Sequence, residues 1–492
     1  MLRQGSTRSP TSRKQRPKLG KLADIIQGGM GVAVSNWGLA KEVSQKGKVG
    51  VVSGTALDTV MARRLQLGDP GGHIQRAMSA FPWPDMVKQI WDKYFVPGGK
   101  PDEKPFKPAP MPSMQMKKSC VEMIMVANFV EVFLAKEGHD GTVGINYLEK
   151  IQMPTLPSLL GAMIAGVNVV LMGAGIPLAI PGALDRLARW EAAEMKIHVE
   201  SDSKIESHCH HFDPRDYCLG ELPALIRPDF LAIVSSDIVA KTLSRKASGE
   251  IDGFVVEYHT AGGHNAPPRR LRGNVEAGLP QCYGSRDMPD IAKIRDLGKP
   301  FWLAGGYASP AALREAKALG AAGIQVGTAF ALSNESGISP EMRLEILRRH
   351  LDGSLAIQTD FCASPTGYPF KVAALGPGCE HAGAREDRCR ICDLGYLRRP
   401  YCREDGSIGY RCPGEPVDFF VKKGGERDET IGRQCLCNGL LAASGLAQSR
   451  GDALEPPILT IGQDLSFLPH LVKDGVLSYS AGDVIDYLDS ES

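Results

Sequence analysis

His264 is the residue in this sequence best placed for acid–base chemistry. It closes the run Ala261-Gly262-Gly263-His264, shortly after a predicted buried strand over residues 253–257. A histidine near its reference pKa of about 6.5 can accept or donate a proton at neutral pH. We therefore predict that His264 is a catalytic base. His259, near the same strand end, is the weaker candidate and is interpreted as a structural or supporting histidine.

Several short glycine runs also follow predicted strands, and two of them could hold a phosphate. Ala304-Gly305-Gly306 and Gly327-Thr328 follow the last two strands of the series. Backbone N–H groups of such turns can bind an anion, and the Thr328 hydroxyl adds a donor. The alternative is that these are ordinary tight turns. Two such turns in consecutive units favour the phosphate site.

The cysteines are concentrated near the C-terminal end of the sequence. Seven of the twelve are Cys379, Cys389, Cys392, Cys402, Cys412, Cys435 and Cys437. Cys389-x-x-Cys392 has metal-type spacing, whereas Cys435-x-Cys437 is tighter, and with Cys412 they could supply thiolates to zinc or an iron–sulfur centre. The alternative is free thiols in a compact loop domain. No apolar secretory segment opens the sequence, so disulfides are not expected, and no metal is assigned.

A second group of possible metal ligands is His208-Cys209-His210-His211, with Asp213 and Asp216 nearby. Adjacent residues cannot all point toward one ion. We interpret this stretch as a surface loop and assign it no metal.

The elements that must position these residues repeat in a strand–helix rhythm. Apolar runs predict eight strands, over residues 23–27, 49–54, 142–147, 167–172, 230–234, 253–257, 301–304 and 323–326. Predicted helices lie between them, over residues 36–45, 156–165, 181–190, 237–247 and 310–319. Eight buried strands alternating with helices predict an α/β fold, a closed (β/α)8 barrel with its active site at the carboxyl ends of the strands. An open doubly wound sheet is the alternative, disfavoured because no G-x-G-x-x-G follows the first strand.

Three regions flank or interrupt this rhythm. Residues 1–22 contain seven Lys or Arg and no Asp or Glu, which predicts a disordered basic tail. The barrel is expected over residues 23–335, with a Pro- and Gly-rich insertion at 68–118, after the second β/α unit, that caps or lids it. Residues 336–492 are expected to form a cysteine-rich extension that packs over one face of the barrel.

Composition excludes several classes of partner. The net charge is +1, from 57 basic and 56 acidic residues, so no nucleic-acid or membrane-surface partner is predicted. No run of about 18 apolar residues predicts a membrane span. We expect a cytoplasmic protein and make no prediction of its oligomeric state.

Five motifs together resemble the nitronate monooxygenase (2-nitropropane dioxygenase-like) family. They are Ile26-Gln27-Gly28-Gly29-Met30, Val143-Gly144-Ile145-Asn146-Tyr147, Ala261-Gly262-Gly263-His264, Ala304-Gly305-Gly306 and the run from Gly323 to Phe330. The resemblance implies an FMN-dependent TIM barrel with His264 as the catalytic base. It also implies that FMN contacts Gln27, Gly28, Gly29, Met30, Asn146, Gly262, Gly263, Gly305, Gly306, Gly327 and Thr328.

The activity implied by the resemblance is oxidation of alkyl nitronates, with a small-molecule substrate and O2 as partners. The sequence departs from short members of the family, which have Ala-Pro-Met after the first strand and lack both the insertion and the cysteine-rich extension. Related flavin enoyl reductases of fatty-acid or polyketide synthesis share the barrel and a Gly-Gly-His motif. An NAD(P)H-dependent enoyl reductase is therefore the alternative, and a non-catalytic flavoprotein is a third hypothesis.

Overall fold

The computed structural model describes residues 23–200, 208–269, 283–360, 364–375, 389–473 and 475–490. The predicted basic tail over residues 1–22 lies outside the described residues, as does Cys379.

Eight parallel strands form a closed barrel, as predicted. They are β1 (Ile25–Gln27), β2 (Gly50–Ser53), β3 (Val143–Leu148), β4 (Val169–Gly173), β7 (Asp229–Val234), β8 (Gly253–Glu257), β10 (Phe301–Ala304) and β11 (Gly323–Val326). Their order is β1-β11-β10-β8-β7-β4-β3-β2. A parallel bridge between Ile26 and Val49 joins the two ends of this series, and the Gln27 N–H donates to the Val49 carbonyl at 2.9 Å. The sheet therefore closes on itself, which establishes the (β/α)8 architecture.

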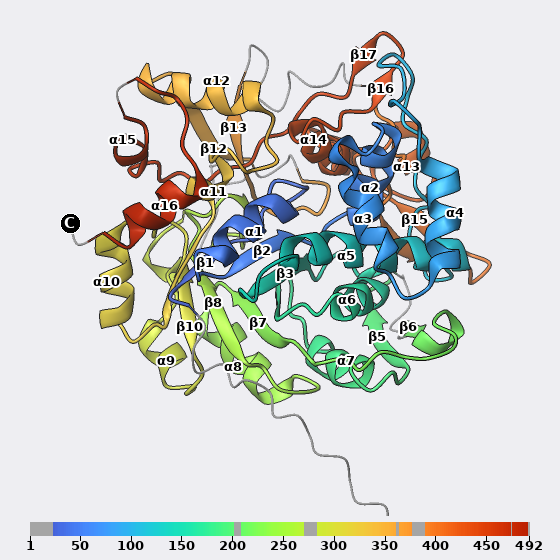
Figure 1. Ribbon diagram of the computed structural model, residues 1–492, viewed down its shortest axis with the longest axis horizontal. Helices are drawn as coiled ribbons and strands as arrows, with labels where there is room; N and C mark the ends of the chain where they lie inside the picture. Colours follow the sequence, from blue (N-terminus) through green and yellow to red (C-terminus); the bar gives the residue numbers. More distant parts are fainter. Residues whose placement is uncertain are drawn as a thin grey trace, which may run out of the picture.

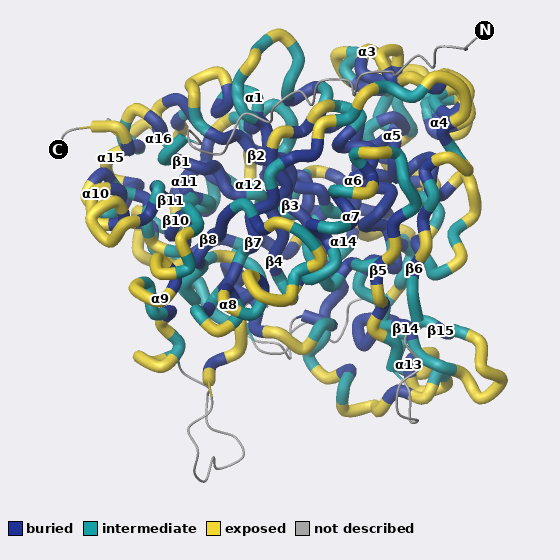
Figure 2. Tube along the Cα trace, turned by 90° about the horizontal axis from the view of Figure 1, so that it is seen from below, coloured by how far each residue is buried: buried dark blue, intermediate teal, exposed yellow. Residues whose placement is uncertain are grey.

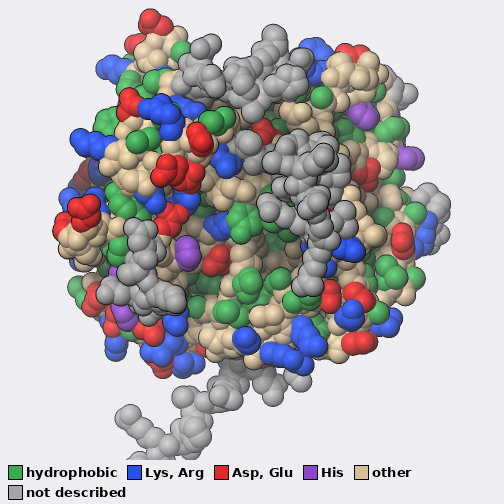
Figure 3. All heavy atoms as spheres, turned by 180° about the vertical axis from the view of Figure 1, so that it is seen from behind, with side chains coloured by type: hydrophobic (Ala, Val, Ile, Leu, Met, Phe, Trp, Pro, Cys, Tyr) green, Lys and Arg blue, Asp and Glu red, His purple; other side chains and the backbone are tan. Residues whose placement is uncertain are grey.

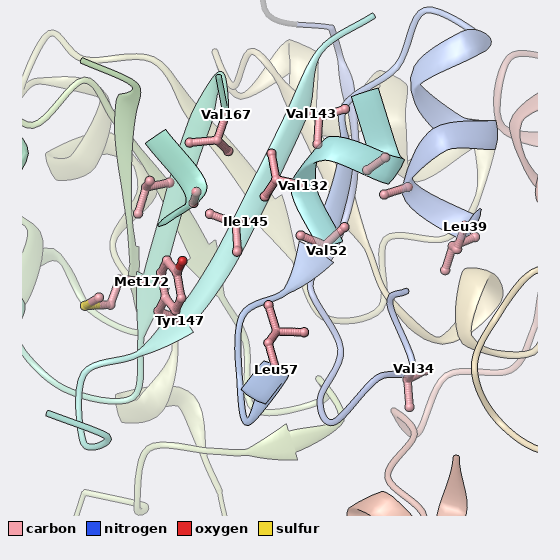
Figure 4. Packing of buried hydrophobic residues seen from close by; sticks show 14 of the residues in the cluster. Val34, Leu39, Val52, Leu57, Val132, Val143, Ile145, Tyr147, Val167 and Met172 are labelled. Carbon is pink, nitrogen blue, oxygen red and sulfur yellow. The ribbon is translucent and has the colours of Figure 1, made fainter. Parts of the chain in front are cut away.

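Alternating strand residues separate the core into an inner and an outer layer. Side chains that point into the barrel form a compact cluster of Ile26, Val49, Val51, Val169, Leu171, Leu231, Val255, Trp302 and Ala304. Their neighbours point outward against the helices, as Val143, Ile145 and Val52 do (Figure 4). The strands are accordingly buried along the centre of the molecule (Figure 2). Both faces of each strand are covered, which is why the strands read as continuous apolar runs.

The barrel helices come mostly from the segment that follows each strand. They are α1 (Trp37–Gln45), α5 (Lys118–Lys136), α6 (Thr155–Ile164), α7 (Ile180–Leu187), α8 (Asp237–Lys246), α9 (Ile291–Arg295) and α10 (Pro310–Ala318). After β11 there is only the short α11 (Thr328–Ala331), and the position between α10 and α1 is taken by α16 (Ala481–Leu488) (Figure 1). The last helix of the described chain therefore completes the helical layer, and the extension is interposed between β11 and this helix.

The insertion after β2 packs on the outside of the barrel. It contains α2 (Leu57–Gln66), a 3-10 turn (Pro70–Gly72), α3 (His73–Ser79) and α4 (Pro84–Tyr94), and then runs to α5. Helices α2, α3 and α4 all contact α5. Phe81 packs edge-on against Phe129 of α5, with ring centroids 5.0 Å apart. These contacts place α3 and α4 beside the barrel wall. The segment after α4 contacts residues of the predicted extension, since the Phe106 N–H donates to the Gln448 side chain and the Met114 N–H donates to the Tyr410 hydroxyl, both at 2.7 Å. The expectation that residues 68–118 cap or lid the barrel stays a prediction.

The extension lies over the carboxyl end of the barrel and has little regular structure. It contains α12 (Pro340–Leu351), β12 (Ala356–Asp360), β13 (Phe370–Ala374), β14 (Arg399–Cys402), β15 (Ile408–Arg411), α13 (Val417–Lys422), a 3-10 turn (Arg427–Thr430), α14 (Leu436–Ala443), β16 (Ser449–Arg450), β17 (Ala453–Leu454) and α15 (Leu468–Leu471). β13 pairs with β12 and with β9 (Gly263–His264), which belongs to the loop after β8. One sheet thus joins the extension to the loop that carries His264.

The surface carries both signs of charge. Basic and acidic side chains are interspersed on the face seen in Figure 3, as the net charge of +1 suggests. None of the described helices is both long enough and apolar enough to cross a membrane.

Candidate active site

A cavity of about 230 Å³ opens at the carboxyl end of the barrel strands. Residues from the loops after β1, β3, β4, β8, β10 and β11 line it, together with residues of the extension. This is the end of the barrel where the sequence placed the site. The predicted residues that line the cavity are Gly28, Gly29, Met30, Asn146, Gly262, Gly263, His264, Gly305, Gly306, Gly327 and Thr328.

Gln27 is the predicted site residue that the structure does not bring to the cavity. Its side chain is fully buried inside the barrel wall. The amide donates to the Ser35 hydroxyl at 2.9 Å and accepts from the Val51 N–H at 3.0 Å. Its hydrogen-bonding groups therefore hold the β1 loop against β2. Gln27 does not line the cavity, and its predicted contact with FMN stays a prediction.

His264 occupies one wall of the cavity and is held by three residues of the extension. Its Nε2 lies 3.2 Å from the Ser364 hydroxyl and 3.3 Å from the Thr366 hydroxyl. The Phe370 ring meets the imidazole edge-on, with centroids 4.7 Å apart. β9 and β13 place these groups, since Phe370 is the register partner of His264. The imidazole is fixed in orientation, as a base must be to meet a substrate proton.

His264 is uncharged at neutral pH. Burial, with a smaller contribution from the positive charge of Lys150, lowers its pKa to about 4. An imidazole with such a pKa keeps a lone pair available to accept a proton over the physiological range. The geometry and the neutral charge state allow His264 to act as a base, while the lowered pKa makes its imidazole a weaker proton acceptor than a free one.

We expect this lowered pKa in the pH dependence of activity. For a substrate that must lose a proton, kcat/KM should stay level down to about pH 5 and fall below it, because His264 protonates near 4. In the unfolded chain the same histidine takes up its proton near pH 6.5. The free energy of unfolding therefore also declines as the pH falls from about 6.5 to about 4. Rates are therefore measured on samples whose circular dichroism shows them folded. An inflection near pH 6.5 would contradict the prediction.

His259 lies outside the residues that line the cavity. Its ring stacks on Tyr283, with centroids 4.4 Å apart, and its buried Nδ1 has no hydrogen-bond partner among the described residues. The structure thus separates the two histidines of this loop, with His264 in the cavity and His259 packed beside it.

Glu257 is a cavity residue that the sequence reasoning missed. It is the last residue of β8, and burial raises its pKa to about 7. A carboxyl group with this pKa can hold or release a proton near neutrality. Its position in the sequence could have identified it as a site residue, because a charged residue that ends a buried apolar strand lies at the carboxyl end of the barrel.

The glycines after β1 and β10 permit close approaches that side chains would block. A Cβ on Gly29 would lie 2.2 Å from the Asn146 Cβ. Gly305 and Gly306 have φ values of +90° and +82°, a conformation that favours glycine. Their peptide groups border the cavity, next to Gly327 and Thr328. The turn after β10 and the turn after β11 thus meet in space, as the predicted phosphate site requires.

The far wall of the cavity comes from the extension. It consists of Phe370, Tyr396, Leu397, Leu436, Cys437, Leu440, Thr460, Ile461, Gly462, Asp464 and Phe467. The Gly462 N–H donates to the Thr328 hydroxyl at 2.8 Å, and the Tyr396 hydroxyl donates to the carboxylate of Asp58, in the first turn of α2. Burial raises the pKa of Asp58 to about 6. These contacts fix the wall to the barrel, and its side chains are mostly apolar.

The histidine-rich stretch near residue 210 is a strand and not a surface loop. β6 (His208–Phe212) pairs antiparallel with β5 (Ala193–Ile197). Alternation buries His210, whose pKa burial lowers to about 4, and exposes His211. The prediction of a surface loop was wrong. The exposed face of this hairpin is polar, and its polar residues concealed the alternating pattern of a strand in the sequence. Its strand geometry still keeps adjacent side chains from sharing one ion.

Comparisons with known proteins give partial matches. No family model matches the chain. A curated relative, the (3aS,4S,5R,7aS)-5-hydroxy-7a-methyl-1-oxo-octahydro-1H-indene-4-carboxyl-CoA dehydrogenase of Rhodococcus jostii (strain RHA1), is 29% identical over 166 residues. That alignment covers 33% of this chain and 41% of the relative, so less than half of the relative is matched.

Three solved structures resemble the chain over most of its length. FabK from Thermotoga maritima has 15% identity and a TM-score of 0.44, with 95% of this chain and 91% of that chain covered. Nitroalkane oxidase from Streptomyces ansochromogenes has 14% identity and a TM-score of 0.44, with 95% and 94% covered. The enoyl reductase domain of MlnA from Bacillus amyloliquefaciens has 11% identity and a TM-score of 0.46, with 94% and 92% covered. Likeness at this level does not identify a function.

Proposed function

We propose that the protein is an FMN-dependent oxidoreductase that oxidises alkyl nitronates with molecular oxygen, including nitronates that His264 forms in the site by deprotonating neutral nitroalkanes. One observation carries the proposal: a fixed, uncharged His264 shares a single cavity with the glycine turns after β10 and β11. A flavin enzyme whose substrate is activated by loss of a proton needs a proton acceptor close to the site that binds the flavin phosphate. The glycine turns after β10 and β11 are the candidate for that phosphate-binding site, called the phosphate cradle below.

The residues present fit FMN. The peptide groups of Gly305, Gly306 and Gly327 can receive a terminal phosphate, and the Thr328 hydroxyl keeps its hydrogen free to donate. Gln325 lines the same cavity, and its buried Oε1 has no hydrogen-bond partner among the described residues. A bound polar ligand would satisfy this atom. A single cradle matches the one phosphate of FMN.

In this mechanism the chain positions the substrate and moves one proton. FMN, when bound, would accept electrons from the substrate and deliver them to O2. His264 takes the proton from the carbon next to the nitro group of a neutral nitroalkane, and Ser364 and Thr366 hold the ring in place. The apolar wall of the extension excludes water from the alkyl chain.

Reduction of an enoyl thioester by NAD(P)H is the second candidate. Its support is the partial match to a dehydrogenase of a carboxyl-CoA compound, together with the apolar wall, which suits an acyl chain. Anaerobic mixing separates the two activities. Bleaching of the flavin by a nitronate and not by NAD(P)H supports nitronate oxidation, and the reverse result supports the reductase. Protein that retains no FMN after incubation with it would contradict both.

The phosphate cradle is tested by replacing Gly306 with valine. A β-branched residue at a φ of +82° costs about 1–2 kcal/mol in backbone strain and displaces the cradle. FMN affinity, measured by fluorescence titration, should fall about tenfold or more. Gly298→Val is the matched control, because Gly298 has a φ of +69° but lies outside the cavity. Equal losses of affinity in the two variants would remove the cradle from the proposal.

A further inference from the structure

Four cysteines of the extension meet beside the active-site cavity. Cys392, Cys412, Cys435 and Cys437 line one small cavity and come from three separate segments. Cys392 precedes β14, Cys412 directly follows β15, and the other two lie at the start of α14. All four thiols are free of disulfides. The motif spacing suggested Cys389 as the partner of Cys392, but Cys389 is exposed and does not line this cavity.

Hydrogen-bond donors surround these sulfur atoms. The backbone N–H of Gly395 donates to Cys392, and that of Gly414 donates to Cys412. The Asn438 side-chain amide donates to the Cys435 sulfur at 3.6 Å. The Cys435 and Cys437 thiols are hydrogen-bonded to each other. N–H donors directed at sulfur orient metal-bound cysteines.

We propose that Cys392, Cys412, Cys435 and Cys437 form a tetrathiolate site for one Zn²⁺ ion. Four cysteine sulfurs are the ligand set of structural zinc sites. The small cavity that they line has a volume of about 10 Å³, which is room for about one water-sized species and favours a single ion over an iron–sulfur cluster. Among the described residues no three metal-type side chains already surround a common point, so the thiols must turn inward when zinc binds.

Charge balance is consistent with this assignment. Each thiol that binds zinc releases a proton to solvent, and four thiolates with one Zn²⁺ leave a net charge of −2. The Gly395, Gly414 and Asn438 donors face this charge, and the Arg398 guanidinium lies near Cys392.

The position of the site gives it a role in shaping the active site. Cys437 lines both the small cavity and the large one, as do its neighbour Leu436 and the pair Tyr396 and Leu397. Zinc would tie the start of α14 to the loops before β14 and after β15. The apolar wall of the large cavity would thereby be held in place without a large hydrophobic core in the extension.

The test measures metal content in the full-length, reduced protein. Plasma mass spectrometry should find one zinc per chain in the wild type and nearly none in Cys412→Ser and Cys437→Ser. Cys402→Ser, in the same extension but outside the small cavity, should keep its zinc, and so should Cys389→Ser. Because a variant can lose metal by misfolding, the wild type is also grown with Co²⁺, which should give ligand-field bands typical of a tetrahedral thiolate site, beyond the flavin absorption.

Several results would overturn the proposal. Wild-type protein without stoichiometric zinc that also fails to take up Co²⁺ is one. Bound Co²⁺ without thiolate bands, or iron with sulfide in place of zinc, is another. Loss of zinc from Cys389→Ser with retention in Cys437→Ser would show that the ligand set is wrong. None of these readouts depends on FMN or on turnover.

Discussion

His264→Asn should lower turnover of a neutral nitroalkane by about 10²–10⁴-fold, the usual contribution of a general base. Asparagine preserves the approximate shape of the imidazole and can still bond with the Ser364 and Thr366 hydroxyls, but it cannot accept the substrate proton. FMN should remain bound, because the candidate flavin contacts come mainly from backbone turns. Steady-state kinetics with the flavin content measured in the same samples check both statements.

The same variant should act almost normally on a nitronate supplied as the anion. That substrate has already lost its proton, so the missing base costs little. A purely structural His264 would instead impair both substrates alike, with loss of flavin or of thermal stability. Unchanged activity of His264→Asn on the neutral nitroalkane would refute the assignment and direct attention to Glu257, a buried carboxyl group in the same cavity.

Arg227→Met should strongly destabilise the fold although it lies outside the site. Arg227 lies at the amino end of the barrel, with its side chain 3% exposed, and forms ion pairs with Asp252 and, at 2.9 Å, with Asp185. It also donates to the Pro228 and Glu250 carbonyls. Removing one partner of a buried pair leaves the other carboxylate uncompensated, and costs about 3–5 kcal/mol. Urea unfolding should show this loss.

Activity per bound flavin should not change in Arg227→Met, since the cavity lies at the opposite end of the strands. Lys299→Met is the matched control. Its ion pair with Glu250, at 3.5 Å, is largely exposed at the same end of the barrel and should contribute at most about 1 kcal/mol. If the two variants lost similar free energies of unfolding, burial of the Arg227 ion pairs would not be the source of their contribution to stability.

Much of the barrel follows from local pattern. Each predicted strand overlaps an observed one, and the helix predicted over residues 310–319 is observed as Pro310–Ala318. A strand that is buried on both faces needs a short run of apolar residues, and a helix that packs against it needs an apolar stripe. Both patterns can be recognised within a short stretch of sequence. The residues just after each strand could then be placed at one end of the barrel, as Gly305, Thr328 and His264 are.

The orientation of polar side chains in the barrel wall was harder to predict from the sequence. Gln27 and Gly28 are adjacent, yet the Gln27 amide bonds with Ser35 and Val51 while Gly28 borders the cavity. Which way a polar side chain turns depends on partners in other strands. A motif at a strand end therefore locates the site without deciding every contact in it.

The sequence by itself determined the barrel, the end of the barrel that carries the site, and His264 as the base to test, because strand and helix periods are local. Only the tertiary structure decided what encloses that site. Ser364 and Thr366 reach His264 across about a hundred residues, α16 completes a helical layer that α1 begins, and Cys392 meets Cys437 in one cavity. These contacts depend on how loops return across the barrel mouth, and no repeating pattern of residue types encodes such paths.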